Sequence, residues 1–257
     1  MRNKSIYNDM FEPIVLMEAY RGSISHNLYV PPSDPMSTDD VDTIRVFAYP
    51  LQYYLTLEGF HRAKETSENK FEEIDEVAYE VRKMFHLLSG ANPNVINTLY
   101  LRRKDYTKMS EAWEYILKNK SMFSSKLVYY TYGGYAHSKI QSMTKGVKMG
   151  YMGEKRFALV KQFGYDTKDA CHLIRLLRVG IEFLRDGEPQ IYRTKDREEL
   201  LSIKRGEWTL EEVQEESAKL VKELDSAYQK SDFPEKPNMA DINKLLYEVM
   251  RMVLDLS

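Results

Sequence analysis

Strand-type segments are confined to the first part of this chain, and this separation constrains the fold more than any single motif. Residues 13–20 form a short apolar run that leads into a turn at Gly22. Residues 40–49 alternate in polarity and are rich in β-branched and aromatic side chains, and residues 69–77 are a weaker third candidate. Such patterns are typical of β-strands. The sequence therefore predicts a sheet built from the first part of the chain.

Helical spacing of apolar residues begins at Ala78, with a stop expected at Gly90, and the chain after Asn94 is predicted to be almost wholly helical. The predicted helices cover residues 110–119, 123–143 and 167–186, followed by a helix with a Thr209–Glu212 capping box and a last helix capped by Asn238. Strands followed by helices indicate an α+β fold. We expect a small mixed-sheet core over residues 1–95 and a helical half over residues 96–257.

Composition excludes several classes of protein. The net charge is -2, so no overall basic field recruits nucleic acid, and any contact with a polynucleotide requires a local patch. The single cysteine, Cys171, excludes an internal disulfide and a multi-cysteine zinc site. No segment has the apolar length of a membrane helix or a signal peptide. We expect a cytoplasmic globular protein without a membrane partner.

Two short motifs, Gly22-Ser23 and Asp40-Val41-Asp42, carry the chemistry. A glycine after a strand lets the backbone approach a ligand, and backbone N–H groups with the serine hydroxyl can hold phosphate. Residues two apart in a strand point to the same face, so the carboxylates of Asp40 and Asp42 are expected to lie side by side. Adjacent carboxylates favour a hard divalent cation, here Mg²⁺ with Mn²⁺ as the alternative. Two such ions would suit phosphoryl transfer.

Each motif has an ordinary explanation when it is taken alone. A Gly-Ser pair is common in turns, and an Asp-x-Asp at the start of a strand is usually a solvated turn. The two motifs in this order, with a strand on either side, are a stronger signal than either one.

Four blocks extend this signal into a family resemblance. They are GSISHNLYVPPSDPMSTDDVDTIRVF, EVAYEVRKMFHLLSGANPNVINTLY, FGYDTKDACHLIRLLRVGIEFLRDGE and ELLSIKRGEW. Together they resemble the bacterial and phage predicted nucleotidyltransferase family of the RNA repair pathway, a branch of the DNA polymerase beta superfamily, over residues 14–245. The resemblance implies a nucleotidyltransferase core followed by a helical substrate-binding half. It also implies transfer of a nucleotide from an NTP to an acceptor hydroxyl, on RNA or another nucleic acid end.

The resemblance also assigns residues. It implies that Gly22 and Ser23 bind the triphosphate, that Asp40 and Asp42 ligate metal, and that Asp75 is the third catalytic carboxylate and metal ligand. An aspartate just before a helix is also an ordinary N-cap, so this role for Asp75 has a structural rival. Glu73 would share its strand face. The loop between the two motifs is longer than in short-loop members of the superfamily. Asp34 and Asp39 in this loop are therefore nearby acids that could be mistaken for the metal ligands.

Three basic residues, Lys168, His172 and Arg175, follow one another at i, i+4 and i+7 and so share one face of the predicted helix over 167–186. Such a row can bind triphosphate or an RNA backbone. The alternative is the solvated side of an amphipathic helix. With the resemblance, we favour nucleotide binding for this row and, as a weaker candidate, for His26, because lone histidines more often serve packing or capping.

The remaining candidates have ordinary explanations by default. Tyrosines at 129, 130, 132 and 135 could stack bases but more often pack between helices. Lys204 and Arg205 are surface charges by default and phosphate contacts by resemblance. Two other functions also stay open: nucleotidyl transfer to a protein or a small molecule, and a catalytically silent nucleotide-binding module.

Overall fold

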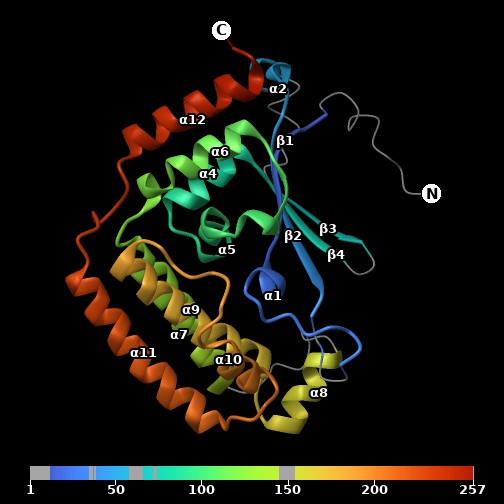
Figure 1. Cartoon of the computed structure of the whole chain (residues 1–257), viewed down its shortest axis with the longest axis vertical. Coiled ribbons are helices and arrows are strands. Elements are labelled where there is room, and N and C mark those ends of the chain that lie inside the picture. The colour runs from blue at the N-terminus through green and yellow to red at the C-terminus, as the bar shows by residue number, and fades with distance from the viewer. Residues whose placement is uncertain are drawn as a thin grey trace.

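Figure 1 shows the chain in a computed structural model, which describes residues 12–34, 37, 39–57, 66–71, 74–144 and 154–256. Its N-terminal part is built around a five-stranded sheet with the strand order β3-β4-β2-β1-β5. The strands are β1 (Ile14–Tyr20), β2 (Val41–Ala48), β3 (Thr66–Phe71), β4 (Ile74–Glu80) and β5 (Tyr106–Met109). The β2 and β4 strands run parallel and the other neighbours run antiparallel, so the sheet is mixed.

Helices lie mainly on one side of this sheet and form a second group beyond its end (Figure 1). Those grouped with the sheet are α1 (Gly22–Ser25), α2 (Leu51–Leu55), α4 (Val81–Ser89), α5 (Pro93–Ile96), α6 (Glu111–Lys118) and α12 (Met239–Leu254). The second group comprises α7 (Leu127–Thr144), α8 (Glu154–Phe163), α9 (Thr167–Asp186), α10 (Arg197–Lys204) and α11 (Leu210–Lys230). Three 3₁₀ turns are η1 (Asn97–Tyr100), η2 (Arg103–Asp105) and η3 (Lys120–Phe123).

The core forms because each element hides one apolar face. In the sheet, Ile44, Val46 and Val77 are buried on strands that pack against α4, and each such side chain stabilises the fold by about 1.5–3 kcal/mol. Helix α9 is central to the second group and contacts α7, α8, α10 and α11. Gly180 permits the close packing of α7, because a β-carbon there would lie 3.1 Å from Tyr132.

The predicted α+β fold with a helical C-terminal half is confirmed. The strands expected over 13–20 and 40–49 correspond to β1 and β2, and the helix expected over 167–186 matches α9. The Thr209–Glu212 capping box and the Asn238 cap are both present.

Two expectations about strands were wrong in detail. The third predicted strand, 69–77, overlaps two antiparallel strands, β3 and β4, which form a hairpin. The chain after Asn94 is not wholly helical, because β5 pairs with the outer edge of β1. The division near residue 95 stays a prediction, and β5 adds to the sheet a strand from beyond it. In the described residues, no helix combines the length and apolar character needed to cross a membrane.

Candidate active site

The turn at Gly22 is fitted closely to the carboxylate of Asp42. Gly22 has a φ of +60°, and a β-carbon built on it would lie 2.3 Å from Oδ2 of Asp42. The backbone N–H of Arg21 donates to the carbonyl oxygen of Asp42 at 2.9 Å, which fixes the turn to β2. Glycine is therefore required here both by backbone conformation and by space.

Asp42 lies directly opposite Asp75 in the parallel register of β2 and β4. Directly paired residues point to the same face of a sheet, whereas Asp40 precedes β2 and is exposed. Burial raises the pKa of Asp42; Arg21 and Lys168 lower it, while the charges of Asp75 and Asp40 raise it further. The charges of both other acids thus act on Asp42, which is half-buried like Asp75.

The alternative role of Asp75, as the N-cap of a helix, was wrong. Asp75 lies inside β4, so it does not cap a helix. The N-cap of α4 is Glu80, whose side chain accepts from the N–H groups of Arg82 at 3.0 Å and Lys83 at 3.3 Å. Glu73 lies outside the described residues. Asp75 is therefore still a candidate for the third catalytic carboxylate that the resemblance implies.

The donor set suits Mg²⁺ without forming a closed cage. Within the described residues, no three or more His, Cys, Asp or Glu side chains converge closely enough to enclose a metal ion by themselves. Mg²⁺ is usually held by one or two carboxylates together with water and substrate phosphates, so a complete protein cage is not required. The hard oxygen atoms and mutual repulsion of Asp42 and Asp75 fit an open site of this kind.

A cavity of about 380 Å³ opens beside Asp42, between the end of the sheet and helices α7, α9 and α10. This volume is in the range of small-molecule sites. Gly22 and Ser23 line it together with cationic and imidazole side chains. These are Arg21, His26, Lys139, Lys168, His172, Arg175 and Lys204, against the carboxylates of Asp39, Asp42 and Asp169. The cavity therefore offers an anionic ligand more positive than negative charge.

The predicted row Lys168, His172 and Arg175 lines this cavity, so the alternative of a solvated helix face does not hold for Arg175, which is only 7% exposed. Among the described residues its guanidinium has no carboxylate partner, and its recorded polar contact is Nη1 to Nδ1 of His26 at 3.4 Å. Burial lowers the pKa of Arg175 to about 10. A buried cation without a counter-charge is costly, which indicates a site for an anionic ligand.

Arg178, one turn further along the same helix, is an arginine whose charge is compensated by carboxylates. Its guanidinium donates to Glu199 at 2.9 and 3.0 Å, to Glu216 at 2.9 Å and to Asp196 at 3.1 Å. These bonds join α9 to α10 and α11. The contrast between the two arginines separates a structural ion pair from a charge that faces the cavity.

His26 is brought to the cavity from the end of α1. Its Nδ1 lies 3.1 Å from the carbonyl oxygen of Ile191, and the side chain is buried. Burial, and then the charge of Arg175, lower the pKa of His26 well below its usual value. The imidazole is therefore neutral at neutral pH, so His26 can offer a hydrogen bond to a ligand but no charge.

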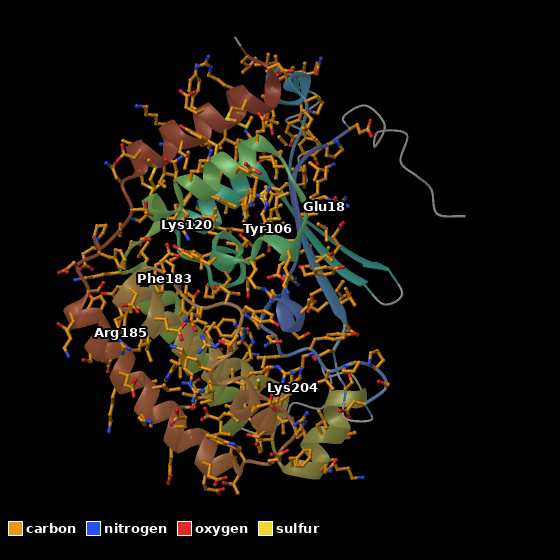
Figure 2. All side chains as sticks on the ribbon, in the orientation of Figure 1. Glu18, Tyr106, Lys120, Phe183, Arg185 and Lys204 are labelled. Atoms are coloured by element: carbon orange, nitrogen blue, oxygen red, sulfur yellow. The ribbon has the colours of Figure 1, made fainter. Side chains whose placement is uncertain are left out.

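Asp39 and Lys204 form a buried ion pair in the cavity wall. Lys204 Nζ contacts Oδ2 of Asp39 and donates to the carbonyl oxygen of Leu28 at 2.8 Å. Lys168 Nζ lies 3.3 Å from Oδ1 of Asp39, and the N–H of Val30 donates to Oδ2 at 2.9 Å. Lys204 is thus not a surface charge, and it ties the loop after α1 to α10 (Figure 2). Asp39 is engaged in this pair, which distinguishes it from Asp42.

The other sequence candidates lie in ordinary environments. Cys171 is buried and free, and burial raises the pKa of its thiol to about 11, so the thiol is unreactive at neutral pH. Tyr129 stacks on Tyr228 of α11 with ring centroids 4.4 Å apart, away from the cavity lining. Tyr135 alone of the four tyrosines lines the cavity, with its ring 5.2 Å from that of His172.

Sequence reasoning missed several residues of the cavity wall, among them Arg21, Lys139 and Asn97. Arg21 adjoins Gly22, and its Nη2 lies 3.9 Å from Oδ1 of Asp42. Lys139 follows Tyr135 by one helical turn and pairs with Asp169 at 2.8 Å. Asn97 lies in η1, and no local pattern marks it. The first two could have been found from their spacing, whereas Asn97 could not.

Comparison with known proteins identifies the family of the chain. A family model described as the RNA repair pathway DNA polymerase beta family matches residues 32–248, so the resemblance noted in the sequence is confirmed. The matched range includes the three acids and the row on α9, whereas Gly22 and Ser23 precede it. No match was found among curated proteins or among solved structures.

Proposed function

The chain belongs to the RNA repair pathway DNA polymerase beta family, and on this premise we propose that it is a metal-dependent nucleotidyltransferase. It moves a nucleotide from an NTP to an acceptor hydroxyl on RNA. Residues 1–95 supply the catalytic core and residues 96–257 the substrate-binding part. Asp42 and Asp75 would ligate the metal together with phosphate oxygens and water, and the preferred ion is Mg²⁺.

One observation carries this proposal: the carboxylate of Asp42 and the uncompensated guanidinium of Arg175 line the same cavity. A metal site alone would not need a buried cation without a counter-charge. An anion site alone would not need a carboxylate, since Asp42 would repel the ligand. A triphosphate that arrives with a divalent cation satisfies both, because the ion neutralises Asp42 and the phosphates neutralise Arg175.

The side chains around the cavity divide the work between binding and chemistry. The backbone N–H groups and hydroxyl of Gly22-Ser23 bind phosphate oxygens, and the fixed glycine turn holds them beside Asp42. Lys168, His172 and Arg175 on α9, with His26 at the end of α1, line the same cavity and orient the rest of the nucleotide. Bound divalent cations supply charge neutralisation and activation of the acceptor oxygen.

The reaction is a displacement at the α-phosphorus. The acceptor oxygen forms a bond to that phosphorus, the bond between the α-phosphorus and its bridging oxygen to the β-phosphate breaks, and pyrophosphate leaves. The hydroxyl proton moves toward the carboxylate of Asp75, which lies beside Asp42 in the sheet. Burial raises the pKa of Asp42, and the charges of Arg21 and Lys168 oppose this shift and so favour the ionised form.

The test is incubation of the full chain with each labelled NTP, Mg²⁺ and total RNA, with products resolved by size. We expect label to enter RNA only when a divalent cation is present. Parallel reactions with a protein mixture and with small hydroxylated metabolites separate the acceptor classes, and label in either of those instead of RNA would change the acceptor. Nucleotide binding without transfer to any acceptor would reduce the chain to a silent nucleotide-binding module.

A further inference from the structure

The cavity changes character along the paired helices α7 and α9. At one end, Lys139 pairs with Asp169 at 2.8 Å, next to Lys168. One helical turn further along, Tyr135 faces His172. Beyond these pairs the wall carries Leu176, which is only 2% exposed. The charged side chains that α9 contributes to the cavity therefore end at Arg175, and Leu176 beyond it is apolar.

The end with fewer charges is closed by the segment α5–η1. Asn97, Thr98 and Leu101 line the cavity there, together with Pro93 and Asn94. This wall has amide and apolar groups and no ionisable side chain. A nucleotide has the same division, with a charged triphosphate at one end and an uncharged base at the other. The base therefore belongs at the α5–η1 end.

This wall is held in place before any ligand arrives. The Asn92 side chain caps α5 by accepting from the N–H of Asn94 at 2.9 Å. The Thr131 hydroxyl of α7 donates to the carbonyl oxygen of Ala91 at 2.8 Å. Preorganised walls of this kind favour specific recognition, because little ordering is required on binding.

The hydrogen-bonding direction of the Asn97 amide in this wall is fixed. The hydroxyl of Tyr132, which is fully buried, donates to Oδ1 of Asn97 at 3.0 Å. With its oxygen engaged by α7, the amide offers its NH₂ group to the cavity. An asparagine that reads adenine does so with both amide atoms, donor and acceptor together. A donor alone favours a base that presents a carbonyl oxygen.

We propose that Asn97 is a specificity-determining residue that donates to a carbonyl oxygen on the base edge of the incoming nucleotide, and that Tyr132 positions it. This inference rests on the proposed function. It assigns the site to NTPs whose bases carry a carbonyl where the others carry an amino group, that is, to GTP and UTP over ATP and CTP.

The test measures dissociation constants of the four NTPs for the full chain, with Ca²⁺ in place of Mg²⁺ to prevent turnover. We expect GTP and UTP to bind about tenfold more tightly than ATP and CTP, the effect of one good hydrogen bond. Asn97→Asp replaces the donor by an acceptor and should reverse this order. Tyr132→Phe keeps the ring and frees the amide to rotate, so discrimination should fall to about twofold or less.

Asn94→Asp is the matched control, because it adds the same negative charge to the same wall. In the described structure no hydrogen bond fixes the direction of the Asn94 side chain. It should weaken all four NTPs alike. A wild-type preference for ATP and CTP, or an Asn97→Asp variant that also weakens all four alike, would overturn the assignment of Asn97 and leave the transferase intact. Failure of every NTP to bind would overturn both proposals.

Discussion

Oδ2 of Asp42 lies 2.3 Å from the position that a β-carbon on Gly22 would occupy. The phosphate-binding turn and the proposed metal ligand are therefore packed against each other. Neither can be moved without moving the other, which links the backbone conformation of the turn to the position of the carboxylate.

Gly22→Ala is expected to reduce transfer strongly while the protein still folds. The added methyl group must displace Asp42 or the turn, and a displacement of about 1 Å at a reacting centre reduces turnover roughly a hundredfold. The positive φ at this position adds about 1–2 kcal/mol of strain. The measurements are NTP turnover and the free energy of unfolding by denaturant.

Gly134→Ala is the control for this substitution. Gly134 is exposed in α7 and has no heavy atom within 4 Å of an added β-carbon. Alanine there should leave turnover unchanged and stabilise the chain by roughly 0.5–1 kcal/mol. Equal activity of both variants would show that the contact between Gly22 and Asp42 has no part in catalysis.

Asp42→Asn is expected to remove divalent-ion-dependent transfer, roughly a hundredfold or more, while keeping the fold. The substitution removes a ligand and also the repulsion from Asp75 and Asp40, so the free energy of unfolding should be unchanged or slightly higher. Turnover and the rise in Tm caused by Mg²⁺ with NTP are the measurements.

Glu76→Gln provides the comparison, since Glu76 follows Asp75 on β4 and pairs with Arg45 at 3.0 Å on the other face of the sheet. It should keep full activity. Normal turnover in the Asp42→Asn variant would end the assignment of Asp42 as a metal ligand.

Much of the fold was predictable because long elements repeat their apolar spacing. Helix α9 buries apolar side chains at helical intervals, and its bounds follow from the sequence. Strand β5 is different, since its residues YTKM have no alternating apolar pattern and form a strand only by pairing with β1. Strand β3, with sequence TSENKF, is as polar as a loop.

The site residues were predictable where they belong to short sequence motifs. They were not predictable where their environment depends on residues far away in the sequence. The sequence DDVD does not reveal which acid is turned inward. Asp39 is buried because Lys204, far along the chain, pairs with it. The sequence of the row on α9 also does not reveal whether these side chains face solvent or a cavity, because charged side chains occur in both environments. Tertiary packing decides both cases.

Arg175→Met and Arg178→Met should have opposite effects, although they change the same residue type on one helix. Removing the uncompensated guanidinium of Arg175 should raise the KM for NTP about tenfold or more and stabilise the ligand-free protein by roughly 1–2 kcal/mol. Removing that of Arg178 takes one partner from each of three carboxylates and should cost roughly 2–4 kcal/mol, with KM unchanged. Equal destabilisation by both variants, with no change in KM, would make Arg175 a structural residue.

Asp196 should give the fold a pH-dependent contribution. Burial alone would raise the pKa of Asp196, but Arg193 and Arg178 outweigh burial and lower it. A depressed pKa in the folded state means that the stabilisation is complete above the unfolded pKa of about 3.9 and is lost as pH falls through the lower folded value. The difference in unfolding free energy between the wild type and Asp196→Asn should therefore be constant from about pH 5 to 7 and shrink below about pH 4. Denaturant titrations across this range measure it, with the exposed Asp241→Asn as the control that stays near zero throughout. A difference that grows as the pH falls would contradict the ion pairs from which the prediction follows.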